Sequence, residues 1–135
     1  MTKTKFIQSL DFICQNIVWS WSYVDHSNKR ILFGIWSDLK MPGGEHLILS
    51  DKWIENSYGV KNLGYSQAIE HLKLVLFSNY ELYTFEQTPI NPKDEVRKTK
   101  EFSERIYKKH LVRRGDGFYS IGTGTSFESY VDVMK

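Results

Sequence analysis

The chain has 135 residues, the usual size of one domain and too few for two. Apolar residues make up 41% of it and charged residues 25%, a composition that excludes a disordered or fibrous protein. The lone cysteine, Cys14, excludes an internal disulfide and a multi-cysteine zinc site. No apolar run approaches the roughly 18 residues of a membrane span, and no secretory apolar region follows the basic N-terminus, so we expect a cytoplasmic protein.

The first third of the chain predicts one helix and three strands. Apolar residues at helical spacing predict an amphipathic helix over residues 5–15. Alternation of side chains over residues 17–24 predicts a strand, and a polar turn then leads into a second strand over residues 30–36. After a turn at residues 41–44, a short third strand is expected at residues 46–49.

Two helices are predicted in the middle of the chain. Ser50 or Asp51 is expected to cap a short helix that carries Trp53. Ser66 is expected to cap a longer helix, whose wide apolar stripe ends near Asn79.

The last part of the chain predicts a strand over residues 80–85 and a weak helix over residues 94–109. The glycines around Asp116 then give the clearest hairpin signal in the sequence. This order of elements predicts an α+β fold with a mixed, mostly antiparallel, barrel-like sheet flanked by helices. We expect one domain over residues 1–122 and a poorly ordered tail over residues 123–135.

Basic residues gather in one segment. Residues 93–114 contain nine of the eighteen lysines and arginines but only four acidic residues, which leaves a local excess of five positive charges. Such asymmetry suits an anionic partner, although a solvated helix face also produces it. The residues predicted to contact a DNA backbone are Lys98, Lys100, Arg105, Lys108, Lys109, Arg113 and Arg114.

The residues that could support catalysis or bind a metal show no suitable pattern. The four histidines are His26, His46, His71 and His110. None has the spacing of a metal site, and no glycine loop has the spacing of a phosphate-binding loop. The sequence therefore predicts no catalytic residue, no metal and no cofactor, so binding is the better-supported class of function.

Aromatic residues supply 15% of the chain, and their pattern leaves two interpretations open. Trp19, Trp21 and Tyr23 are expected on one face of one predicted strand, where they form either a buried core or a stacking surface for a planar base. In the second interpretation, carboxylates accept hydrogen bonds from a base and serine hydroxyls add polar contacts. The predicted base pocket consists of Trp19, Trp21, Ser22, Asp25, Trp36 and Asp38.

A family resemblance favours the second interpretation. The sequence motifs that carry the resemblance are Trp19-Ser20-Trp21-Ser22-Tyr23-Val24, Ile31-Leu32-Phe33-Gly34-Ile35-Trp36, Leu47-Ile48-Leu49-Ser50-Asp51-Lys52-Trp53, Gly64-Tyr65-Ser66-Gln67, Glu70-His71-Leu72, Tyr80-Glu81-Leu82-Tyr83-Thr84-Phe85 and Leu111-Val112-Arg113-Arg114-Gly115-Asp116-Gly117-Phe118-Tyr119. Over residues 5–121 the chain resembles the N-terminal domain of bacterial modification-dependent, McrA-type HNH restriction endonucleases. Related enzymes carry PUA-like, EVE-like or YTH-like barrels that accept a flipped, modified base.

The resemblance implies a module that recognises a modified, methylated base in duplex DNA and targets a restriction system. In that family an HNH nuclease would follow Lys135, and its motifs are not in this chain, so cleavage would need a nuclease domain in the same or a partner chain. A protein-interaction or regulatory domain that uses the aromatic face is the alternative. A small-molecule or RNA-binding barrel ranks third and an enzyme last, and no membrane partner is expected.

Overall fold

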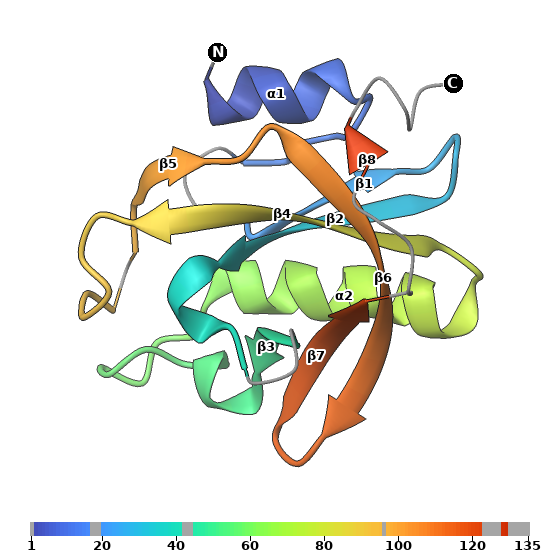
Figure 1. Ribbon diagram of the computed structural model, residues 1–135. Coiled ribbons are helices and arrows are strands. Elements are labelled where there is room, and N and C mark those ends of the chain that lie inside the picture. The colour runs from blue at the N-terminus through green and yellow to red at the C-terminus, as the bar shows by residue number, and fades with distance from the viewer. Residues whose placement is uncertain (1, 17–19, 42–44, 96, 123–127, 130–135) are drawn as a thin grey trace.

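The computed structural model describes residues 2–16, 20–41, 45–95, 97–122 and 128–129 (Figure 1). In these residues two α-helices and two short 3-10 helices accompany eight strands. The helices are α1 (Lys3–Ser9), η1 (Ser37–Leu39), η2 (Asp51–Trp53) and α2 (Leu63–Phe77). The strands are β1 (Ser22–Asp25), β2 (Arg30–Trp36), β3 (His46–Ser50), β4 (Glu81–Pro89), β5 (Thr99–Phe102), β6 (Arg105–Arg114), β7 (Gly117–Gly122) and β8 (Glu128–Ser129).

The main sheet has the order β1-β2-β4-β6-β7-β3, with β5 paired to β4 and β8 to β6. β2 and β4 run parallel, and the other described strand pairs are antiparallel. β1 and β3 end this order, and no pairing in the described residues joins them, so this sheet is not closed into a barrel. The predicted α+β class with a mostly antiparallel sheet is confirmed.

The two α-helices, α1 and α2, cover opposite faces of strands β1, β2 and β4 (Figure 1). One core joins α1 to the sheet through Phe6, Ile7, Leu10, Tyr23, Leu32, Tyr83, Phe85 and Ile106. The other joins α2 to the opposite face through Val24, Ile31, Phe33, Leu49, Ala68, Leu72 and Leu82. Within the described chain, no helix has the length and apolar character needed to cross a membrane.

Local signals located several elements correctly. Strands were found at the predicted ranges 30–36 and 46–49, and the Ser50 side chain accepts a hydrogen bond from Lys52 N at the start of η2. α2 ends just before Asn79, whose φ of 60° stops the helix. The β6–β7 turn falls on Gly115 and Asp116, with Gly115 at φ 56°.

The predicted helix over residues 94–109 is wrong. β5 and the first half of β6 occupy that range instead, and both strands pair antiparallel with β4. Lys, Glu and Arg are good helix formers, but backbone pairing with β4 and β7 outweighs this weak preference. The basic residues therefore lie along strands, where successive side chains alternate between the two faces.

Three boundaries also differ from the predictions. α1 ends at Ser9 rather than residue 15, because Asp11 has a φ of 69° and interrupts the helix. α2 begins after Asn62, whose side chain forms no capping hydrogen bond, and Ser66 is its fourth residue rather than its cap. Of the strand predicted over residues 17–24, residues 17–19 lie outside the described residues, and β1 begins at Ser22. In the predicted tail only β8 is described, and it pairs with Arg105 and Ile106.

Candidate nucleic-acid interface

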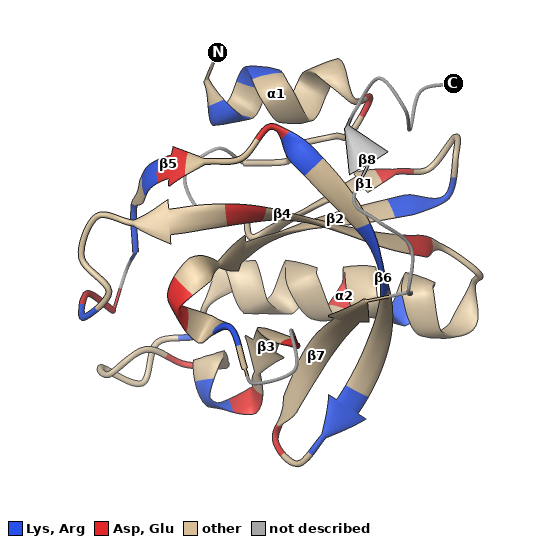
Figure 2. Cartoon of the chain, viewed as in Figure 1, with Lys and Arg blue, Asp and Glu red and all other residues tan. Residues whose placement is uncertain are grey.

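Strand β6 carries five basic residues and no acidic one in its ten positions. Arg105, Lys108, Arg113 and Arg114 are exposed, and Lys109 is half-buried. Figure 2 shows these basic segments at the start, the middle and the end of a strand that crosses the front of the molecule. A strand of ten residues spans about 30 Å. Because side chains alternate along a strand, Arg105, Lys109 and Arg113 lie on one face of β6 and Lys108 and Arg114 on the other, so the strand carries a row of positive charge on both faces.

The two arginines at the end of β6 have acidic partners next to the two ends of β3. Arg113 donates from Nη1 and Nη2 to the two carboxylate oxygens of Asp51, at 3.0 and 2.5 Å. Those hydrogen bonds hold the pKa of Asp51 below its ordinary value. Arg114 contacts the Glu45 carboxylate through Nη1. Exposed pairs of this kind contribute little stability, so a phosphate can replace the carboxylate.

The two lysines in the middle of β6 differ in their surroundings. Lys108 Nζ lies 3.4 Å from Glu81 Oε1, in an exposed ion pair. Lys109 has no carboxylate within 4.0 Å among the described residues, and its Nζ lies 5.3 Å from the ring centre of Tyr107. Burial lowers the pKa of Lys109, with a further contribution from Lys40. Glu86 raises that pKa from a greater distance, so Lys109 is a half-buried cation with no close carboxylate among the described residues.

Lys98 and Lys100 continue this row less strongly. Lys98 precedes β5 and Lys100 lies in it, and both are exposed. β5 and β6 pair antiparallel with successive parts of β4, so the two strands follow one line. Glu101 in β5 and Glu104 between β5 and β6 reduce the positive charge there. The structure therefore brings the predicted DNA-backbone residues onto one side of β4, with β6 as the strongly basic part.

Asp25, a predicted acceptor for a base, lies in a buried ion pair. Its Oδ2 accepts from Arg30 Nε at 3.0 Å, from Arg30 Nη2 at 2.7 Å and from Asn28 Nδ2 at 2.8 Å. Asp25 and Arg30 are 3% and 6% exposed. Burial raises the pKa of Asp25, but the hydrogen bonds from Asn28 and Arg30 outweigh it and leave the pKa below its ordinary value. The carboxylate stabilises the β1–β2 hairpin.

Trp36 and Asp38 share one partner at the far end of β2. Arg97 donates to both carboxylate oxygens of Asp38, at 2.7 and 2.9 Å, and its guanidinium carbon lies 5.4 Å from the Trp36 ring centre. About six residues of strand, or roughly 20 Å, separate Trp36 from Arg30 and hence from Asp25. Trp36 and Asp25 therefore cannot line one pocket the size of a base.

Trp21 and Ser22 pack toward α2. The Trp21 ring centre lies 6.2 Å from that of Trp53, at an interplanar angle of 88°, and the indole covers Gly64 of α2. Tyr23 packs on the opposite face, in the α1 core, so these two aromatic residues do not share a face as predicted. Trp19 lies outside the described residues. The five described residues of the predicted base pocket are thus divided among separate sites.

Ser22 also forms an unexpected contact with a histidine. Its Oγ lies 2.5 Å from His71 Nδ1, and burial, with a smaller contribution from His26, lowers the pKa of His71 to about 4. A hydroxyl beside a neutral imidazole is the geometry of a nucleophile and its base. Ser22 has no exposed surface, however, so a substrate cannot reach it. We interpret the pair as a structural link between β1 and α2.

A cavity of about 400 Å³ lies between the end of α2, the start of β4 and the middle of β6, and we name it the α2–β6 cavity. β4 pairs with β6 only from Leu82 to Thr84, whereas β6 continues to Arg114 against β7. The residues between α2 and Leu82 do not pair with β6, and the cavity lies between these residues and β6. The sequence did not predict this cavity, because its walls come from elements that are far apart in the chain.

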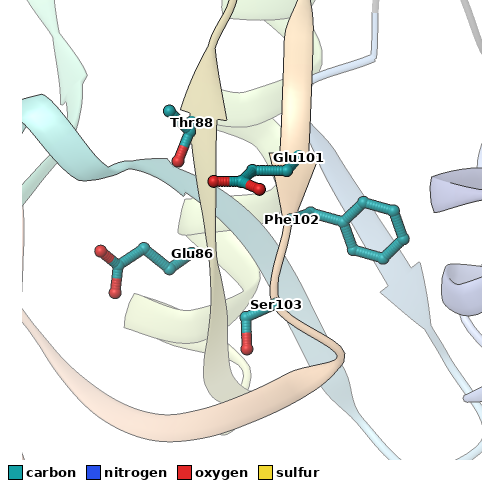
Figure 3. Close-up of a pocket in the computed structure, with 5 residues that line it drawn as sticks. All are labelled: Glu86, Thr88, Glu101, Phe102 and Ser103. Atoms are coloured by element: carbon teal, nitrogen blue, oxygen red, sulfur yellow. The ribbon is translucent and has the colours of Figure 1, made fainter.

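A second pocket, of about 280 Å³, is formed by β4 and β5 (Figure 3). It is lined by Glu86, Thr88, Glu101, Phe102 and Ser103. Figure 3 shows the Phe102 ring directed away from the carboxylate of Glu101. Two carboxylates and no basic side chain make this pocket unsuitable for a phosphate. In the described part of the chain, no group of three or more acidic, histidine or cysteine residues could hold a metal ion.

Comparison with known proteins adds no further assignment. No protein-family model, no curated protein sequence and no solved structure matches this chain.

Proposed function

We propose that this protein binds duplex DNA and uses β6 as its phosphate-contacting strand. The observation that carries the proposal is the run of five basic residues without an acidic one along about 30 Å of strand. A row of that length suits several successive phosphates better than one small anion. Binding would release counter-ions from the DNA, so affinity would fall steeply with salt.

The resemblance to the N-terminal domains of McrA-type enzymes extends the proposal to recognition of a modified, methylated base. Phosphate contacts position a protein on DNA but carry no sequence information, so recognition requires a second contact with a base. A PUA-like module of a restriction system, acting with an HNH nuclease domain in the same or a partner chain, would fit this role. The mostly antiparallel sheet between two helices is compatible with that proposal.

Charge reversal on β6 tests DNA binding. Lys108→Glu combined with Lys109→Glu should weaken duplex binding for every sequence and reduce the slope of log affinity against log salt by about 2. Lys61→Glu combined with Lys73→Glu changes the net charge equally, at exposed positions in another part of the chain. Equal losses in both double variants, or no duplex binding by the unchanged protein, would contradict the proposal.

Association with another protein is the second candidate function. It is favoured by large apolar side chains on the surface, since Tyr58 is 89% and Phe77 80% exposed. Under this alternative the β6 double variant keeps its partner, and replacing Tyr58 or Phe77 with serine removes it. A pull-down with both variants separates the two functions.

A further inference from the structure

The walls of the α2–β6 cavity combine apolar and cationic groups. Val75 and Leu76 of α2 face it together with Leu82 of β4 and Leu111 of β6. Tyr80 adds an aromatic ring, held by a hydrogen bond of 2.8 Å between its hydroxyl and His26 Nδ1. Such a surface suits a planar, weakly polar ligand, because binding there removes its apolar surface from water.

The polar wall of the same cavity suits an anion. Lys108, Lys109 and His110 line it from β6, and because side chains alternate along a strand, Lys109 is the one on the same face as Leu82 and Leu111. Lys108 shares the Glu81 carboxylate, whereas no described carboxylate lies within ion-pair distance of the half-buried Lys109. Glu86 acts on Lys109 only from beyond ion-pair distance, so a phosphate beside Lys109 would add a close counter-charge in partly dehydrated surroundings, where the attraction is stronger than in water.

The cavity also offers hydrogen bonds for a base edge. Asn79 lines it, and its amide carries both a donor and an acceptor. Asn79 has a φ of 60° and is exposed, because it occupies the turn between α2 and β4. An amide at this position is close to the apolar wall of Val75 and Leu76, which belong to the preceding helical turn.

We propose that the α2–β6 cavity receives one nucleotide extruded from DNA that is bound along β6. Its base lies against Val75, Leu76 and Leu111, and its phosphate is paired with Lys109. This inference rests on the proposed function and moves base recognition away from the tryptophans near β1 and β2. A volume of about 400 Å³ lies within the usual range of small-ligand pockets. The site adjoins the basic strand, so an extruded base does not need to travel far from the duplex.

A duplex that contains a single 2-aminopurine tests the proposal, because this fluorescent base brightens when it leaves the stack. With the unchanged protein, fluorescence should rise on binding. Leu76→Trp places a large ring in the cavity from a residue that is 47% exposed, so it should remove the rise and weaken binding about tenfold. Phe77→Trp is the matched control, since Phe77 is 80% exposed and does not line the cavity, and it should behave like the unchanged protein.

Lys109→Gln provides a second variant that leaves the apolar wall intact. It should reduce the fluorescence rise more than Lys108→Gln does, because Lys108 already has Glu81 as a partner. Salt-dependent duplex binding without a fluorescence rise, or a full rise with Leu76→Trp, would overturn the inference and leave the proposed function standing. Absence of duplex binding by the unchanged protein would overturn both.

Discussion

Ser22 and His71 join the first strand of the sheet to the long helix through a buried hydrogen bond, with Ser22 Oγ 2.5 Å from His71 Nδ1. Ser22 has no exposed surface and His71 is only 9% exposed, so the imidazole is held neutral in a dry environment. A protonated ring at this position would lose solvation, and the attraction of Glu70 is too weak to offset that loss. The contact therefore makes the packing of α2 sensitive to acid.

Acid should destabilise the protein through His71. Folding lowers the pKa of His71 from 6.5 to about 4, so the folded state binds fewer protons than the unfolded state between these values. Its contribution to stability is fully present above pH 6.5 and is lost as the pH falls toward 4. A shift of this size corresponds to at most about 3 kcal/mol. Urea denaturation at several pH values measures the effect.

The matched variants for this prediction are His71→Gln and His26→Gln. His71→Gln should be less stable at neutral pH, yet its free energy of unfolding should fall less between pH 6.5 and 4 than that of the unchanged protein. Some pH dependence should remain, because burial also lowers the pKa of His46. His26 is exposed, so His26→Gln should keep most of the original slope. Parallel curves for all three proteins would contradict the assignment to His71.

The ion pair between Asp25 and Arg30 should be worth far more than its counterpart between Asp38 and Arg97. Asp25→Asn leaves the Arg30 charge buried without its counter-ion, which costs about 3–5 kcal/mol. Asp38→Asn makes the same chemical change, but Asp38 is exposed, so a cost of about 1 kcal/mol or less is expected. Chemical denaturation measures both variants. Similar losses would show that burial is not the deciding factor.

Features that depend on a few adjacent residues could be predicted from the sequence. The β6–β7 turn needs a residue that tolerates a positive φ, and Gly115 supplies it at 56°. The long helix follows from its apolar stripe, and Asn79 marks its end because asparagine readily adopts a left-handed conformation. The partly buried Trp21 also agrees with the core interpretation that the sequence left open.

Features that depend on tertiary pairing could not be predicted. The segment of β6 contains good helix formers, and only its neighbours β4 and β7 make it a strand. Asp25 was an expected base acceptor, but nothing in the local sequence indicated that Arg30 would occupy its carboxylate. Ser22 and His71 are 49 residues apart, and no sequence spacing indicates that they meet. The α2–β6 cavity depends on the same kind of long-range arrangement.

Gly64 should be needed for the contact between α2 and Trp21. A Cβ at Gly64 would lie 2.4 Å from Trp21 Cε2, so alanine forces the indole to move. Helix propensity favours alanine by about 1 kcal/mol, but overpacking costs about 1–3 kcal/mol, so Gly64→Ala should destabilise the protein or at best leave it unchanged. Gly122→Ala is the control, since a Cβ there meets nothing within 4 Å. Thermal denaturation compares them, and a clear stabilisation by Gly64→Ala would contradict the contact.

Asp51 should restrain DNA binding because it occupies the guanidinium of Arg113. Asp51→Asn removes the competing charge but keeps the side-chain shape, which leaves Arg113 available for a phosphate. The slope of log affinity against log salt should become steeper by about 1, whereas stability should change by less than about 1 kcal/mol because the pair is exposed. Asp116→Asn removes the same charge from the adjacent β6–β7 turn, where the carboxylate lies 3.8 Å from Lys52 and acts on Arg113 only at longer range, without a hydrogen bond. Band-shift titrations over a range of salt concentrations compare the two variants. If both steepen the slope equally, the effect reflects net charge alone and Arg113 is not a phosphate contact.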